Sequence, residues 1–114
     1  MIVEQRTYTL LPGRVTEYFR LYQAEGAAVQ RKHLGRLLGY YSSEIGELNQ
    51  VIHLWAYEDL MDRSQRRAAL FADEEWLTYF NKIIAFVTRQ STQILVPAPF
   101  IMPKEGEWRE MSGC

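Results

Sequence analysis

The chain has 114 residues, of which 47% are hydrophobic and 24% are charged, and its net charge is −1. This length and composition predict one globular domain with a single core, and they exclude an intrinsically disordered chain. A charge so close to zero gives no positive field for gathering nucleic acid or anionic lipid, so neither is an expected partner. The only cysteine is Cys114, which excludes an internal disulfide and a zinc site built from thiolates.

The first half of the chain predicts a strand, a long helix and two further strands. Residues 2–10 are rich in Val, Thr and Tyr and run into a Pro-Gly break, which is typical of a strand followed by a turn. From Arg14 to about His33 the apolar residues recur every three or four positions, which indicates an amphipathic helix. Gly26 marks a kink or a close contact inside it, and Gly35 marks its end. Strands are predicted at 36–45 and 49–57, joined by the tight connection "GELN".

The second half predicts a helix in two pieces and a last strand. One piece begins near Asp59, and Asp73 is the expected N-cap of the other, with Glu74 and Glu75 at its positive end. The final strand is predicted at "TQILV", ending before Pro97. Residues 102–114 lack periodicity and are expected to form a mobile tail after a domain of residues 1–101. The order βαββαβ predicts a four-stranded sheet with both helices on one face.

The other face of this sheet needs a cover of its own. Ile52, Leu54 and Ala56 alternate with a more aromatic set, and we expect the aliphatic side to lie under the helices. A buried ion costs several kcal/mol unless it is matched, so the uncovered face is expected to carry the charged pair and its aromatic neighbours. These residues are Glu4, Arg6, Tyr8, His53 and Trp55. Trp55, Tyr57 and Tyr8 on this face together exceed the patch of roughly 300–600 Å² that a monomer tolerates, which predicts a homodimer, or a multiple of dimers, forming a closed barrel.

Three segments resemble the NIPSNAP family across residues 2 to about 100: "EQRTYTLLPGRVTEY", "KHLGRLLGYYSSEIGELNQVIHLWAYEDL" and "ILVPAPF". The most specific features are Glu4-x-Arg6-x-Tyr8 before Pro12-Gly13, and His53-Leu54-Trp55-x-Tyr57. The resemblance implies an α+β, ferredoxin-like fold with a four-stranded antiparallel sheet, of the dimeric α/β-barrel class. It implies no particular reaction.

Five residues are the candidates for ligand binding: Arg6, Tyr8, Asn49, His53 and Trp55. Asn49, His53 and Trp55 share one side of a strand and are also the catalytic candidates, because histidine titrates near neutral pH and tryptophan offers a flat surface. Arg6 is suited to hold a carboxylate or an oxyanion. Each also has a structural interpretation: His53 as a satisfied core group, Trp55 as a dimer anchor, and Glu4 and Arg6 as a neutralising pair.

Other features predict no further chemistry. Arg63, Arg66 and Arg67 lie near Asp62 and are interpreted as a solvated helix face, with an anion site as the weaker alternative. His33 is interpreted as a cation at a helix end. Two histidines without a paired carboxylate motif are too few for a metal site, and no phosphate-binding or dinucleotide-binding motif is present, so no cofactor is predicted. No signal peptide or membrane span is visible, and a cytoplasmic location is expected.

Three functions fit these observations. The first is a homodimer that binds a small apolar or aromatic ligand in the barrel cleft. The second is an enzyme similar to cofactor-independent monooxygenases of the same fold class, with Asn49, Trp55 and His53 positioning a phenolic substrate. The third is an interaction module that recruits partners through its helices. Fold alone does not decide among them, so whether there is any catalysis stays open.

Overall fold

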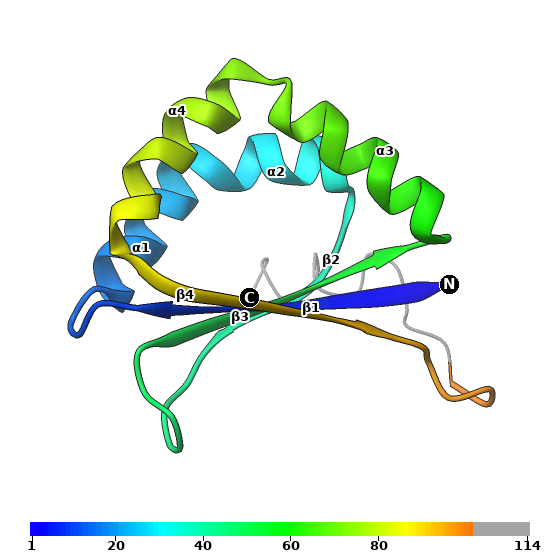
Figure 1. Cartoon of the computed structure of the whole chain (residues 1–114), viewed down its shortest axis with the longest axis horizontal. Coiled ribbons are helices and arrows are strands. Elements are labelled where there is room, and N and C mark those ends of the chain that lie inside the picture. Colours follow the sequence, from blue (N-terminus) through cyan, green and yellow to red (C-terminus); the bar gives the residue numbers. More distant parts are fainter. Residues whose placement is uncertain (102–114) are drawn as a thin grey trace, which may run out of the picture.

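The computed structural model of the protein describes residues 1–101 and consists of one four-stranded sheet under an arch of helices (Figure 1). The strands are β1 (Ile2–Leu10), β2 (Arg36–Ser42), β3 (Gln50–Tyr57) and β4 (Val87–Leu95). The helices are α1 (Val15–Leu21), the π-helix η1 (Tyr22–Gly26), α2 (Ala27–Leu34), α3 (Leu60–Phe71), α4 (Glu74–Ile83) and the 3-10 turn η2 (Ile84–Phe86). The predicted tail lies outside the described residues.

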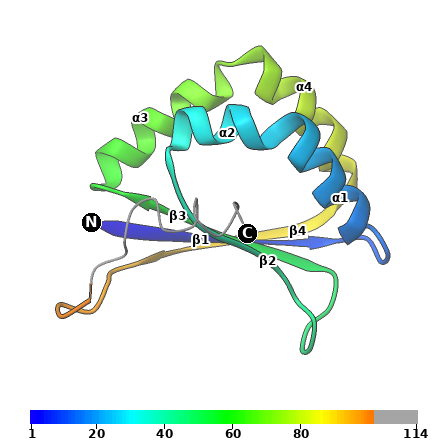
Figure 2. The same cartoon turned by 180° about the vertical axis from the view of Figure 1, so that it is seen from behind.

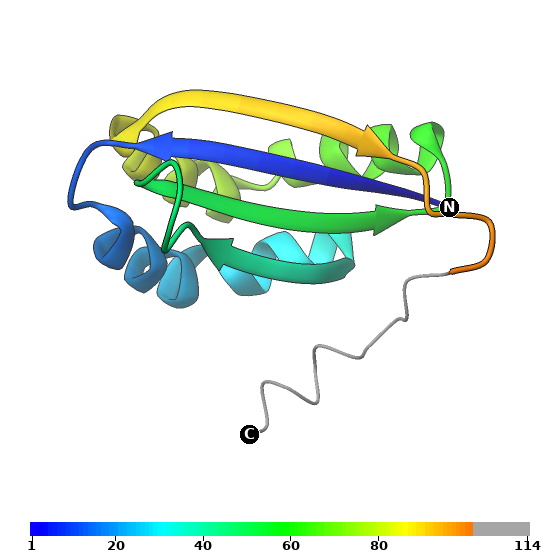
Figure 3. The ribbon, with the colours of Figure 1, turned by 90° about the horizontal axis from the view of Figure 1, so that it is seen from below.

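The strands are antiparallel and lie in the order β2-β3-β1-β4, which is the ferredoxin-like α+β arrangement. From behind, α1 and α2 lie in front, above the edge strand β2 (Figure 2). From below, the helices are seen only beyond the sheet, so one sheet face has no helix on it (Figure 3). The fold predicted from the sequence pattern and the family resemblance is confirmed.

Local sequence signals fix three of the helix ends. Asp59 caps α3 by accepting the Asp62 backbone N–H at 2.8 Å. Asp73 caps α4 by accepting the Glu75 backbone N–H at 2.9 Å, as predicted. Gly35 ends α2 with φ of 86°, a conformation that favours glycine because other residues have a Cβ atom there.

The predicted strand boundaries are less accurate. β2 ends at Ser42 rather than at residue 45, and β3 begins at Gln50 rather than at residue 49. The last strand was predicted at residues 92–96 but spans Val87–Leu95. Nearly all of β4 is exposed at the edge of the sheet, so its polar first half carries no burial pattern that sequence periodicity can detect.

The prediction of which sheet face lies under the helices is wrong. Tyr8, His53 and Trp55 are at most 7% exposed, and Tyr8 and Trp55 pack in one core cluster with side chains of the helices. The strand register places Glu4 opposite Trp55 and Arg6 opposite His53, so the charged pair is on the same side. The face without helices, called here the uncovered face, instead carries Val3, Gln5, Thr7, Ile52, Leu54 and Ala56.

The charged pair can lie under the helices because a residue far away in the sequence neutralises the Glu4 carboxylate. Burial of Glu4 would be costly if Arg6 were its only partner, but Arg63 of α3 reaches the same carboxylate. The dimer surface predicted on the face of Tyr8 and Trp55 is therefore covered by the chain's own helices.

Candidate functional site

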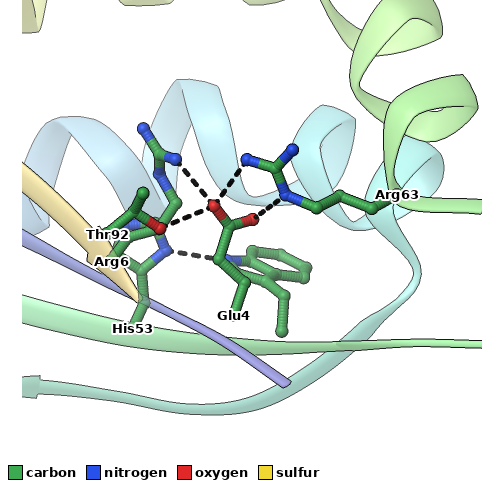
Figure 4. Close-up of polar contacts among 6 residues, drawn as sticks. Glu4, Arg6, His53, Arg63 and Thr92 are labelled. Atoms are coloured by element: carbon green, nitrogen blue, oxygen red, sulfur yellow. Dashed lines mark hydrogen bonds and ion pairs between the residues drawn. The ribbon is translucent and has the colours of Figure 1, made fainter. Parts of the chain in front are cut away.

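A fully buried carboxylate lies at the centre of the site, between β1 and α3 (Figure 4). Glu4 Oε2 accepts hydrogen bonds from Arg6 Nη1 at 3.0 Å, Arg63 Nη2 at 2.8 Å and Thr92 Oγ1 at 2.7 Å. Its Oε1 accepts Arg63 Nε at 3.0 Å, so the Arg63 guanidinium binds in the bidentate manner. Strands β1 and β4 and helix α3 are thus joined at one side chain.

These donors keep Glu4 ionised inside the protein. Burial alone would raise its pKa, because a carboxylate is less well solvated there. The hydrogen bonds from Arg63 and Thr92 and the charges of Arg6 and Arg63 outweigh burial, and the pKa falls to about 2. Glu4 is therefore a fixed negative charge at any physiological pH.

The surroundings carry more positive than negative charge. Arg67 lies one helical turn after Arg63, is partly buried, and has its guanidinium carbon 5.5 Å from the centre of the Phe71 ring. Burial first, and then the charge of Arg6, lower the pKa of Arg67. We call Arg6, Arg63 and Arg67 the arginine cluster. Arg6 and Arg63 contact Glu4, and Arg67 is close enough to be influenced by its charge, so three positive charges surround one carboxylate and leave an excess of two.

The arginine cluster is reachable from solvent at the β4 edge of the sheet. The side chains of Arg6 and Arg63 are 12% and 23% exposed. Two apolar side chains flank it: Phe71 on α3 is 38% exposed, and Ile94, which lies opposite Glu4 in the strand register, is 41% exposed. The site therefore combines an electropositive centre with an apolar rim.

His53 presents a hydrogen-bond donor and not a base. Trp55 Nε1 donates to His53 Nδ1 at 2.7 Å, so Nδ1 carries no proton and the neutral ring carries it on Nε2. The ring stacks on Tyr40 at 4.5 Å and meets Tyr8 edge-on at 5.1 Å. Burial, and next the charge of Arg6, lower its pKa to about 3, so the ring stays neutral at physiological pH.

Two buried polar atoms near the arginine cluster have no hydrogen-bond partner among residues 1–101. They are His53 Nε2 and the Tyr57 hydroxyl, and both side chains are 0% exposed. Burial, and next the charge of Glu4, raise the pKa of the Tyr57 hydroxyl to about 12, although the three arginines lower it. The hydroxyl therefore stays protonated. Buried polar groups are nearly always paired, so these two donors are available to a ligand or to ordered water. Among residues 1–101, Trp76 Nε1 and the Tyr79 hydroxyl are also buried without a partner.

Four of the five ligand-binding candidates come together here, and one does not. Arg6, Tyr8, His53 and Trp55 share the helix side of the sheet. Asn49 instead occupies the turn before β3 with φ of 63°, and its backbone carbonyl accepts the Leu10 N–H at 2.7 Å. A residue in this conformation fixes the turn, so we assign Asn49 a structural role.

Sequence reasoning did not consider Thr92, and its preferred interpretation of Arg63 and Arg67 as a solvated helix face is wrong. A signal was present for the two arginines. With the buried Leu70 they follow the i, i+4, i+7 spacing of one helix face, so both lie on the stripe that packs toward the sheet. For Thr92 the missing information was the pairing of β4 with β1, which places it opposite Arg6.

His33 also differs from the expectation. Its Nε2 lies 2.8 Å from Asp73 Oδ2, while its backbone carbonyl accepts Arg66 Nη1 at 3.2 Å. The ring therefore links the end of α2 to the N-cap of α4, and the hydrogen bond from His33 lowers the pKa of Asp73.

Known proteins of similar sequence have the same fold. The model of the NIPSNAP family matches residues 3–102. A NIPSNAP-like domain protein from Burkholderia xenovorans is 48% identical, with a TM-score of 0.87 over 90% of this chain and 89% of that one. A NIPSNAP family protein from Agrobacterium tumefaciens is 40% identical, with a TM-score of 0.88 over 91% and 94% of the two chains.

More distant matches add length and fold information. Human NipSnap homolog 3A is 32% identical over 109 residues, which cover 90% of this chain but 43% of the relative, so the chain spans less than half of that protein. A putative antibiotic biosynthesis monooxygenase from Nitrosomonas europaea is 12% identical with a TM-score of 0.62, over 85% of this chain and 98% of that one. That likeness concerns the fold alone. Within residues 1–101, no helix has the length and apolar character needed to cross a membrane.

Proposed function

The chain belongs to the NIPSNAP family, and on that premise we propose that it is a homodimer that binds a small organic anion with an apolar or aromatic body. The observation that carries this proposal is the excess of two positive charges at the arginine cluster beside two unpaired buried donors. The binding site consists of the arginine cluster with His53 and Tyr57.

A bound anion would neutralise part of the excess positive charge at the arginine cluster. A partly buried guanidinium without a matching negative group is costly, and within residues 1–101 the carboxylate beside Arg6, Arg63 and Arg67 is that of Glu4. A ligand carboxylate or phenolate supplies one negative charge and oxygen atoms for the guanidinium N–H groups. The exposed faces of Phe71 and Ile94 then accommodate the apolar body.

A binding experiment with a simple aromatic carboxylate tests this proposal. We expect benzoate to bind the wild-type protein saturably in isothermal titration calorimetry. Arg67→Gln should weaken binding about tenfold or more, because a hydrogen bond between charged groups contributes roughly 1.5–3 kcal/mol. Arg89→Gln is the matched control, since Arg89 is an exposed arginine on β4 and loses the same charge. Equal effects of the two substitutions, or no saturable binding, would refute the site.

The apolar residues of the uncovered face support the proposed dimer. Val3, Leu38, Leu54 and Leu95 line an apolar groove of about 410 Å³ on that face, together with residues 96–98 and Ile101. A sheet face of this kind loses apolar area from water when a second copy packs on it. Light scattering should give twice the mass of one chain at micromolar concentration, and a monomeric mass would contradict the dimer.

A second candidate function is cofactor-independent oxygenation of a phenolic substrate. The neutral N–H of His53 beside the arginines favours it, because such a donor stabilises an oxyanion that develops during reaction. Oxygen uptake with a dihydroxyphenol should then occur in the wild type and fall with Arg67→Gln. Uptake equal to that of buffer would reject this activity while leaving binding intact.

A further inference from the structure

A second pocket lies on the opposite flank of the sheet, and we propose that it is a separate binding site for a small planar aromatic molecule. It has a volume of about 400 Å³, and its lining comes from α1, η1, α2 and the edge strand β2. Figure 2 shows these elements side by side. Its walls are formed by Phe19, Tyr22, Gln23, Ala27, Leu37 and Tyr40. We call it the aromatic pocket, and it goes beyond the anion site proposed above.

The aromatic pocket and the arginine cluster are separated by packed rings. Thr92, which hydrogen-bonds to Glu4, lies on β4, whereas Tyr40 of the aromatic pocket lies on β2. These two strands are the edges of the sheet. The Tyr40 ring stacks on His53 with an interplanar angle of 6°, so it forms a wall between the two regions. The pocket lining does not include Glu4 or any residue of the arginine cluster.

The polar ends of the lining tyrosines are already held on other protein atoms. The Tyr22 hydroxyl donates to Gln30 Oε1 at 2.6 Å, and both side chains are buried. The Tyr40 hydroxyl lies 2.5 Å from the Tyr18 hydroxyl. With both hydroxyl groups engaged, the rings contribute mainly carbon to the pocket, which favours recognition by stacking and apolar contact.

The π-helix keeps the pocket open. η1 carries Tyr22 and Gln23, and its last residue, Gly26, packs so close to α4 that a Cβ atom there would lie 2.7 Å from the Tyr79 ring. This contact fixes the turn against the core, so the pocket does not depend on a flexible loop. The next residue is the small Ala27, which leaves room where a larger side chain would fill the space. Single π-turns inside helices are often found at functional sites.

The lining defines the class of ligand. A volume of about 400 Å³ falls in the lower part of the range for small-molecule sites, which suits one or two fused rings. The exposed residues Gln23 and Arg31 contribute the amide and guanidinium groups of the pocket lining. A flat ring therefore packs against Phe19, Tyr22 and Tyr40, with a polar edge toward Gln23 and Arg31.

A fluorinated neutral probe distinguishes this site from the anion site. We expect 5-fluoroindole to bind the full-length protein saturably, followed by ¹⁹F NMR. Ala27→Leu fills the pocket and should weaken binding at least tenfold. Ala28→Leu adds the same atoms at an exposed neighbouring position outside the lining and should leave binding unchanged. Arg67→Gln should also leave it unchanged, so failure of the anion site does not affect this result.

A second measurement uses only the wild-type protein, so it remains informative if Ala27→Leu folds poorly. In the wild-type protein, 5-fluoroindole should shift the methyl resonances of Leu37, which lines the pocket, and not those of Leu54 on the uncovered face. Linear, unsaturable association, equal loss of binding in Ala27→Leu and Ala28→Leu, or shifts at Leu54 in place of Leu37 would each overturn the proposal.

Discussion

Replacing Glu4 with glutamine removes the negative charge that Arg6 and Arg63 share. The substitution keeps the shape of the side chain but leaves Arg6 and Arg63 without their carboxylate partner. The fall of the Glu4 pKa from its ordinary value of 4.5 to about 2 corresponds to about 3 kcal/mol at roughly 1.4 kcal/mol per pH unit. This agrees with the ~3–5 kcal/mol lost when one partner of a buried pair is removed. We expect Glu4→Gln to lower the free energy of unfolding at pH 7 by about 3 kcal/mol.

The pH dependence gives this prediction a second readout. A carboxyl whose pKa is depressed on folding contributes stability that is complete above its ordinary pKa and lost as the pH falls toward the folded value. The wild type should therefore lose about 3 kcal/mol between about pH 5 and pH 2 through Glu4, whereas Glu4→Gln should not. Urea unfolding followed by tryptophan fluorescence measures both proteins across this range. A difference below about 1 kcal/mol at pH 7, or a gap that persists at pH 2, would refute the reasoning.

Three further predictions test the packing, the tautomer and the dimer. Gly26→Ala should lower the melting temperature, because the new methyl group would lie 2.7 Å from the buried Tyr79 ring and overpacking costs about 1–3 kcal/mol; a rise in stability would contradict this contact. The His53 ring should not titrate between pH 5 and 8 in ¹⁵N NMR, since its pKa is about 3 and Nδ1 accepts from Trp55, whereas a midpoint above pH 6 would show a different environment. Leu54→Glu places a charge in the apolar groove and should give a monomer in light scattering, while persistence of the dimer would exclude the uncovered face as the interface.

The sequence predicted the order of elements because each signal was local. The composition of β1, the helix start near Asp59, the cap Asp73 and the stop at Gly35 all depend on neighbours within one turn or strand. Gly26 was predicted as a kink or close contact, and the structure has that contact against Tyr79. β4 was only half predicted, because an exposed edge strand has no buried face to impose a period.

The site was harder to predict because its partners are far apart in the sequence. The two-residue period of strands groups Arg6 with Tyr8 and His53 with Trp55, and the cost of burying charge then assigned both pairs to one side of the sheet, as in the observed register. Choosing the side required knowing that Arg63, 59 residues later, matches the charge of Glu4. The rule that buried ions need partners was sound, but it was applied before all the partners were known.

The central claim, that the arginine cluster holds an anion, is tested most directly by the sign of a charge change. Benzoate affinity of Glu4→Gln and of Arg67→Gln should be measured by calorimetry on variants shown to be folded. Removing the negative charge of Glu4 should strengthen binding, and removing the positive charge of Arg67 should weaken it, each by about tenfold or more, since unit charges about 8 Å apart interact by roughly 2 kcal/mol at an effective dielectric constant near 20. Opposite shifts confirm an electropositive anion site, whereas shifts in the same direction, or unchanged affinity in both variants, would contradict it.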